Sequence, residues 1–214
     1  IGEARSMSIH ESQSLFFEMQ LGCHPKFIEC LSPLIIEKFG KQKSFSFENL
    51  YKLITKVSPG FIRVDADEVT YPAHIIVRYE IERKLINNQI KVDEVPELWR
   101  EKMKNLLGID TKGNFKDGVM QDIHWPEGLF GYFPCYTLGA IYAAQWFHMI
   151  SKEINDIDQI IGENELEPIF NWLKNNIWEK ASLLSTTELV NQATNNEGLN
   201  TKYYKMHLEQ RYLN

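Results

Sequence analysis

Apolar side chains recur at helical spacing along most of this chain, and this pattern limits the fold more than any other feature of the sequence. They return every three or four residues in segments 15–23, 27–39 and 47–54, as they do in helices that bury one face. Strand patterns are nearly absent, although the IKV sequence at 90–92 fits a short strand. The sequence therefore predicts a mostly α fold.

Glycine, proline and serine mark the expected ends of several helices. Gly40 closes the second apolar stripe, and Ser46 stands where a third helix needs its N-cap. The segment 96–108 begins with proline and ends with glycine, which predicts one compact helix. A buried helix is expected from Cys135 onward, and three further helices are expected within residues 155–214.

A longer helical pattern covers residues 65–88. Pro72 lies in its first part, so the helix is expected to begin or to kink near that residue. Arg78 and Glu82 are four residues apart, which predicts an ion pair on the surface of this helix.

Composition excludes several broad classes of protein. The chain has 214 residues, is 43% hydrophobic and carries a net charge of −6, whereas proteins that bind nucleic acids or anionic membranes usually have basic excess. No apolar run approaches the roughly 18 residues of a membrane span. Three cysteines fit neither a disulfide framework nor a zinc spacing, which favours a reducing, cytoplasmic setting. No linker is visible, so residues 1–214 are expected to form one region.

The HESQS sequence at 10–14 places five polar residues before an apolar stretch. A carboxylate such as Glu11 is a standard zinc ligand when histidines come from elsewhere. His10 and Gln13 flank it on the same helix. The same pattern also fits the capped start of a surface helix, so the residues alone leave both interpretations open.

The FIRVDAD sequence at 61–67 places Arg63 before two acids. Its planar guanidinium group can hold a carboxylate through two hydrogen bonds, as a substrate site requires. A local ion pair between Arg63 and Asp65 or Asp67 at a helix start is the alternative.

Two further clusters combine polar and aromatic side chains. Gln121, Asp122 and His124 lie within four residues, and a histidine held by an acid can transfer protons or donate to an oxyanion. Tyr132 and Tyr136 are one helical turn apart and offer hydroxyl donors. A satisfied, partly buried histidine and ordinary aromatic packing are the alternatives.

These clusters occur in the same order, and with similar residues, as the motifs of one family. HESQ at 10–13, IRVDAD at 62–67 and GVMQDIHW at 118–125 resemble the motifs of the carboxypeptidase Taq family of metallocarboxypeptidases. The segments 67–86 and 128–145 also resemble the family, and the likeness weakens after about residue 150. It implies an all-helical, zincin-type fold with a deep substrate groove. The chain departs from the family pattern because H-E-x-x-H and D-x-R-x-T are both absent.

The resemblance implies a role for each candidate residue. Glu11 matches the family's third metal ligand, and Arg63 either grips the terminal carboxylate of the substrate or orders the groove. The remaining assignments are catalytic donors at His124, Tyr132 and Tyr136, a substrate contact at Gln121, and supporting contacts behind the site at His10, Gln13 and Asp122.

The resemblance also implies what the whole enzyme does. Such an enzyme holds zinc, or another divalent metal such as cobalt, and releases C-terminal amino acids from peptides as a homodimer. Since the chain begins at Ile1 and lacks H-E-x-x-H, it is expected to be the C-terminal part of such a protein, and by itself to bind no zinc and cleave no peptide. The alternative is a non-catalytic helical interaction module derived from the enzyme.

Overall fold

The computed structural model describes residues 3–213, and every regular element in that range is a helix. The mostly α prediction is therefore confirmed. Ten α-helices are joined by short 3₁₀ segments and by one π-helix, η1 (Phe16–Gly22), that continues directly from the first α-helix. The α-helices are α1 (Met7–Leu15), α2 (Pro25–Phe39), α3 (Phe47–Ile54), α4 (Tyr71–Ile86), α5 (Val95–Leu107), α6 (Pro134–Glu153), α7 (Ile157–Gly162), α8 (Glu167–Asn176), α9 (Thr186–Ala193) and α10 (Lys202–Tyr212).

Contacts divide the chain into two compact units. The first unit combines the residues up to Thr55 with those from Leu138 onward, and the second unit is the continuous segment Lys56–Thr137. The expectation of one region over residues 1–214 stays a prediction.

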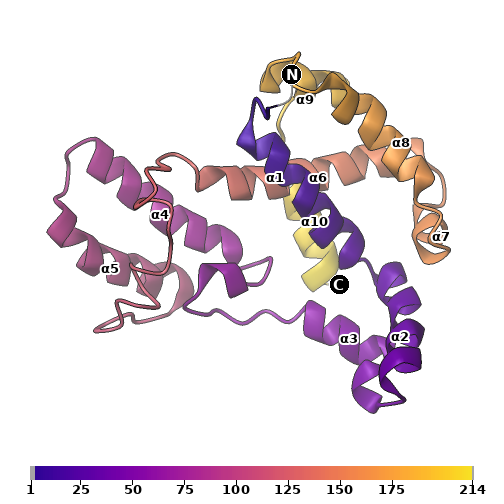
Figure 1. Ribbon diagram of the computed structural model, residues 1–214, viewed down its shortest axis with the longest axis horizontal. Coiled ribbons are helices and arrows are strands. Elements are labelled where there is room, and N and C mark those ends of the chain that lie inside the picture. Colours follow the sequence, from indigo (N-terminus) through magenta and orange to yellow (C-terminus); the bar gives the residue numbers. More distant parts are fainter. Residues whose placement is uncertain (1–2, 214) are drawn as a thin grey trace. The chain divides into compact units, whose positions relative to one another are not determined.

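The core of the first unit forms around α6, which α1 and α10 both contact (Figure 1). Trp146 and Ile150 of α6 are fully buried, together with Phe16 of η1 and Leu173 of α8. Small residues on α6 let neighbouring helices approach its backbone closely. This packing fixes α1, the helix that carries the HESQ motif, against the centre of the unit.

The second unit is built on the pair α4 and α5, which lie side by side (Figure 1). Val77 and Ile81 of α4 face Trp99 and Met103 of α5, and all four side chains are almost completely buried. The long loop of residues 108–133 contributes Val119 and Trp125 to the same cluster. The loop that carries the GVMQDIHW motif is thereby attached to a rigid helical pair.

Most of the predicted helix ends are confirmed. Gly40 and Gly108 follow the last residues of α2 and α5 with φ angles of 83° and 73°, a conformation that glycine adopts without strain. Ser46 precedes α3, and Pro72 lies in the first turn of α4. After residue 154, however, four α-helices replace the three predicted, because residues 157–162 form a separate short helix.

Two local predictions are wrong. Residues 90–92 form no strand, since the backbone N–H of Lys91 donates to Glu94 at the 3₁₀ turn that leads into α5. Arg78 and Glu82 do not pair with each other, because both side chains turn into the unit. Arg78 pairs with Asp122, whereas Glu82 accepts hydrogen bonds from the Trp125 indole and from the backbone of Gly131.

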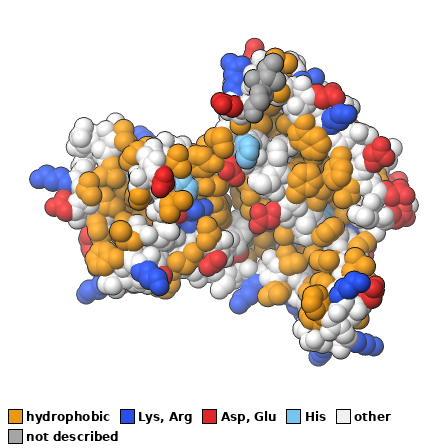
Figure 2. Space-filling model, viewed as in Figure 1, with side chains coloured by type: hydrophobic (Ala, Val, Ile, Leu, Met, Phe, Trp, Pro, Cys, Tyr) orange, Lys and Arg blue, Asp and Glu red, His pale blue; other side chains and the backbone are white. Residues whose placement is uncertain are grey.

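Acidic and basic side chains are interspersed on the face shown in Figure 2, without a large patch of one sign. Hydrophobic side chains also reach this surface. Within residues 3–213, the helices are all too short or too polar to cross a bilayer.

Candidate active site

The HESQ motif lies in the interior of α1. Ser6 caps this helix by accepting a hydrogen bond from the backbone N–H of Ile9, so the cap lies before the motif rather than inside it. Ser12 is fully buried, Glu11 is half-buried and His10 is exposed. The Glu11 side chain is thus packed partly against the protein and keeps some access to solvent.

Helix α1 meets α6 at Glu11 with almost no space between the two backbones. A Cβ atom added to Gly139 would lie 2.8 Å from the Cβ atom of Glu11 and 3.1 Å from its carbonyl carbon. Real Cβ atoms do not approach each other this closely, so only glycine fits at this crossing. The position of Glu11 therefore depends on Gly139.

We expect Gly139→Ala to destabilise the chain by about 1–3 kcal/mol, because the added methyl group overpacks the α1–α6 contact. In an open helix the same change would stabilise by up to about 1 kcal/mol. Gly162→Ala on α7 is the matched control, since a Cβ there meets only side-chain atoms of Lys26, at 3.8 Å or more. Urea unfolding of both variants measures the difference, and equal effects would contradict the close crossing.

In the second unit, two buried arginines share one carboxylate. Arg63 places Nε and Nη2 at 2.9 and 2.8 Å from Asp122 Oδ1. Arg78 places the same two nitrogens at 2.6 Å from Oδ2. The alternative of a local ion pair between Arg63 and Asp65 or Asp67 is therefore wrong. Asp67 instead accepts hydrogen bonds from the backbone N–H groups of Ser58, Val69 and Thr70.

His124 lies next to this ion pair but bonds to a tyrosine. Its Nε2 atom is 2.9 Å from the Tyr136 hydroxyl group, whereas Nδ1 is 3.9 Å from Asp122 Oδ1, beyond hydrogen-bonding distance. Arg63 stacks over the Tyr136 ring with its Cζ atom 5.0 Å from the centroid. We call Arg63, Arg78, Asp122, His124 and Tyr136 the arginine–histidine cluster.

Burial sets the protonation states in and around this cluster. It lowers the pKa of Arg78 to about 10 although Asp122 acts in the opposite sense, so the guanidinium group stays charged at neutral pH. Burial, followed by the charge of Arg63, lowers the pKa of His124. Burial and Arg78 lower the pKa of the fully buried His74 on α4 to about 4. Both histidines are therefore neutral at pH 7.

Gln121 and Tyr132 complete the residues predicted for this unit. The Gln121 side chain accepts from the backbone N–H of Arg63 at 2.8 Å and donates to the carbonyl oxygens of Phe61 and Asp117. Its amide thus joins the two motif loops to each other. The Tyr132 ring lies 5.6 Å from the His124 ring, and the Nε2 atom of that histidine hydrogen bonds to Tyr136.

The donors for a metal ion are incomplete in this chain. No group of three or more histidine, cysteine, aspartate or glutamate side chains able to hold a metal occurs among residues 3–213. A half-buried carboxylate such as Glu11 has the right chemistry for one donor to a divalent ion. The residues present thus fit a metal site only if further ligands come from outside this chain.

Several side chains in these two regions were not predicted as site residues from the sequence. Arg78 lies three residues from both Ile75 and Ile81, which are buried, so a charge on the apolar stripe of α4 was the available signal. Nothing local marks Trp146 or Trp178. Their indole groups hydrogen bond to residues of the HESQ motif that are 134 and 165 positions away in the sequence.

Known proteins resemble this chain along its whole length. The model of the family described as carboxypeptidase Taq (M32) metallopeptidase matches residues 1–212. Carboxypeptidase 1 of Bacillus subtilis is 38% identical over an alignment of 215 positions that covers 100% of this chain and 42% of the relative. Thermostable carboxypeptidase 1 of Pyrococcus furiosus is 36% identical over 97% of this chain and 41% of its own length.

Solved structures agree with the fold. Metallocarboxypeptidase 1 of Trypanosoma cruzi superposes with a TM-score of 0.95 at 47% identity, covering 99% of this chain and 44% of that structure. The chain spans about two fifths of the length of the curated relatives it matches, 41% and 42% in the two cases above. With the family model matched over residues 1–212 and the all-helical fold shared, this chain belongs to the carboxypeptidase Taq (M32) family of metallopeptidases.

Proposed function

We propose that this chain acts as the C-terminal part of a metallocarboxypeptidase that removes single amino acids from the free C-termini of peptides. The observation that carries the proposal is the match to the family model over residues 1–212, with the HESQ, IRVDAD and GVMQDIHW motifs in order. The names of the relatives, carboxypeptidase 1 and thermostable carboxypeptidase 1, support this reaction class.

Glu11 is the residue proposed to ligate the metal, together with ligands from outside this chain. The proposed metal is zinc, or another divalent ion such as cobalt. When bound, such an ion polarises the scissile carbonyl group and lowers the pKa of a water molecule. The contribution of this chain is a carboxylate on a helix whose backbone is held against α6 at Gly139.

The arginine–histidine cluster is proposed to supply donors to the reacting carbonyl group. Neutral His124 and the Tyr136 hydroxyl group form one hydrogen-bonded pair, so one of them can donate to an oxyanion while the other holds it in place. Tyr136 is favoured over Tyr132 for this role because it bonds directly to His124. Asp122 orients the pair only indirectly, through Arg63.

Of the two roles considered for Arg63, we propose the one that orders the groove. Its Nε and Nη2 atoms face Asp122, and its Nη1 atom donates to the Tyr71 hydroxyl group at 2.7 Å. Gln121 is assigned a similar ordering role, because its amide bonds to backbone groups on both motif loops.

Two further properties are proposed, the first from the cysteines and the second from the family resemblance. We place the enzyme in the cytoplasm, where the free thiols of Cys23, Cys30 and Cys135 stay reduced. We propose that it assembles as a homodimer, and the large apolar side chains exposed on this chain are compatible with a contact to a second copy.

The proposal is tested by comparing this chain alone with the same chain in its complete gene product. We expect the isolated chain to bind no zinc and to leave a blocked dipeptide intact, since it supplies one ligand of three. The complete product should contain zinc and release the C-terminal residue, and a chelator should abolish that activity. Zinc stoichiometry and product release are the measurements.

The alternative interaction module predicts a different outcome. A complete gene product that begins just before Ile1, contains no H-E-x-x-H and shows no hydrolysis would overturn the carboxypeptidase proposal. Enzyme-like activity in the isolated chain would contradict the assignment of the missing ligands to another segment.

A further inference from the structure

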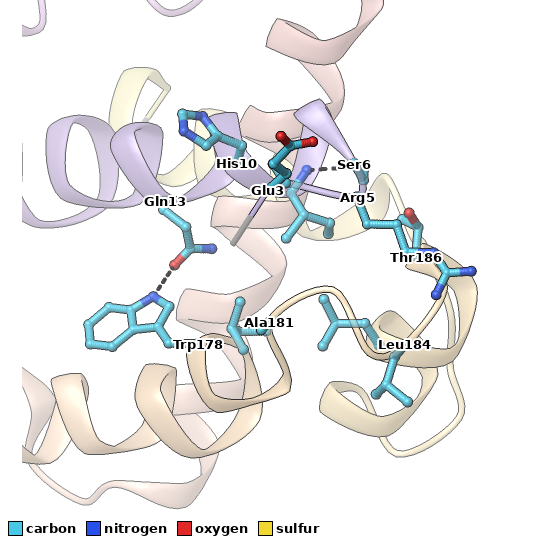
Figure 3. A pocket seen from close by; sticks show the side chains of 13 residues that line it. Glu3, Arg5, Ser6, His10, Gln13, Trp178, Ala181, Leu184 and Thr186 are labelled. Atoms are coloured by element: carbon cyan, nitrogen blue, oxygen red, sulfur yellow. Dashed lines mark hydrogen bonds between the residues drawn. The ribbon is translucent and has the colours of Figure 1, made fainter. Parts of the chain in front are cut away.

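Two tryptophans are connected through the HESQ motif by a continuous chain of hydrogen bonds. The Trp178 indole N–H donates to Gln13 Oε1 at 2.8 Å (Figure 3). Gln13 Nε2 in turn donates to Ser12 Oγ at 2.8 Å. The Trp146 indole N–H donates to the same Ser12 oxygen at 3.2 Å. Ser12 in turn donates to the carbonyl oxygen of Ile9 at 2.6 Å, so its hydroxyl group is saturated.

These contacts lie on the two residues that directly follow Glu11. Successive side chains of an α-helix point about 100° apart, so contacts on Ser12 and Gln13 fix the rotation of α1 about its own axis. Gly139 fixes the distance between α1 and α6 at Glu11 itself. Trp146 comes seven residues after Gly139, two helical turns, and therefore approaches α1 from the same side of α6.

The rotation of α1 determines where the Glu11 carboxylate lies. Turning the helix by about 20° would move each Cα atom by about 0.8 Å, and the carboxylate oxygens by more. Metal–ligand distances tolerate only about 0.2 Å. Unrestrained rotation of a nine-residue helix would therefore misplace the ligand.

We propose that Trp178 and Trp146 are positioning residues that orient Glu11 toward its metal through Gln13 and Ser12. This inference rests on the proposed function, in which Glu11 is a metal ligand. It also gives Gln13 a defined task, since its amide connects the outer tryptophan to the buried serine.

Trp178 allows a test that keeps the core intact. Trp146 is fully buried in the main apolar cluster, so its removal would strongly destabilise the unit, whereas Trp178 is 40% exposed and lines the pocket beside α1. Trp178→Phe keeps an aromatic ring of smaller size and removes the indole donor. Trp172→Phe is the control, because the Trp172 indole N–H donates to Glu153 of α6 at 2.9 Å rather than to the HESQ motif.

The experiment uses the complete gene product that contains this chain. Trp178→Phe is expected to weaken zinc affinity about 10-fold, within the range for residues that orient metal ligands, as measured by competition with a chelator. It should lower kcat with little change in KM, and thermal unfolding of the metal-free protein should shift only slightly. Trp172→Phe should lower the unfolding temperature and leave zinc affinity unchanged.

Glu11→Gln, measured in parallel, separates the two levels of the proposal. If Glu11→Gln loses zinc while Trp178→Phe keeps wild-type affinity, the positioning role is overturned and the ligand assignment stands. If Trp178→Phe and Trp172→Phe both lose zinc in proportion to their loss of stability, the effect is general unfolding and the positioning role is again overturned. If Glu11→Gln retains zinc, the ligand assignment itself fails.

Discussion

Replacing Asp122 with asparagine is expected to destabilise the chain by about 3–5 kcal/mol, because it leaves two buried guanidinium groups without their shared counter-charge. Arg63 and Arg78 each direct two nitrogens at this carboxylate, from distances of 2.6 to 2.9 Å. The Arg78 side chain is fully buried and that of Arg63 is 7% exposed, so water cannot replace the lost partner. The two positive charges would also repel each other.

Urea unfolding at pH 7 measures this loss. The matched control is Asp110→Asn, which removes an acid that Arg100 contacts at 2.7 Å on the surface, where solvent screens the pair. The control should change stability far less than Asp122→Asn does. If the two variants lose similar stability, the Asp122 carboxylate is not what stabilises the two buried arginines. The double variant Asp122→Asn with Arg63→Met should recover part of the loss, since it removes one of the unpaired charges.

Local chemistry explains why the helix ends were predictable. Gly40, Gly108 and Pro72 restrict their own backbones, and this restriction acts within one turn of the residue. The strand proposed at 90–92 failed because strand formation needs a partner, and the segment instead closes a turn through Lys91 and Glu94.

The contacts that could not be predicted from the sequence join residues that are far apart in the chain. The sequence suggested acids next to Arg63 in its own motif, but the acid that Arg63 contacts lies 59 residues away. The preference for Tyr136 over Tyr132 as the partner of His124 likewise depends on how the loop before α6 folds. The roles of all these side chains in catalysis stay proposals for experiment.

Buried charged residues could not be recognised from local spacing either. The i,i+4 spacing of Arg78 and Glu82 predicted a surface pair because residues four apart are neighbours on the surface of a helix. In the folded unit both residues are buried, and tertiary partners with better geometry take their place. A charged residue at the spacing of an apolar stripe is therefore better interpreted as the sign of a buried partner elsewhere in the chain.

His74 is expected to make the stability of the chain fall in mild acid. Its pKa is about 4 in the folded chain because of burial and the nearby charge of Arg78, compared with 6.5 in the unfolded chain. The unfolded chain therefore binds more protons between these two values. The stabilisation from neutral His74 is present above pH 6.5 and is lost as the pH falls toward 4, with a change of about 2 kcal/mol between pH 7 and 4.5.

Urea unfolding of the wild type and of two variants, His74→Gln and His74→Phe, at pH 7 and pH 4.5 isolates this contribution. Other groups also titrate in this range, but they are common to all three proteins and cancel in the comparison. Both variants are expected to lose less stability than the wild type on acidification, whatever their stability at pH 7. The same loss in all three proteins would mean that His74 accepts a proton inside the folded chain, and that Arg78 and Arg63 do not hold it neutral.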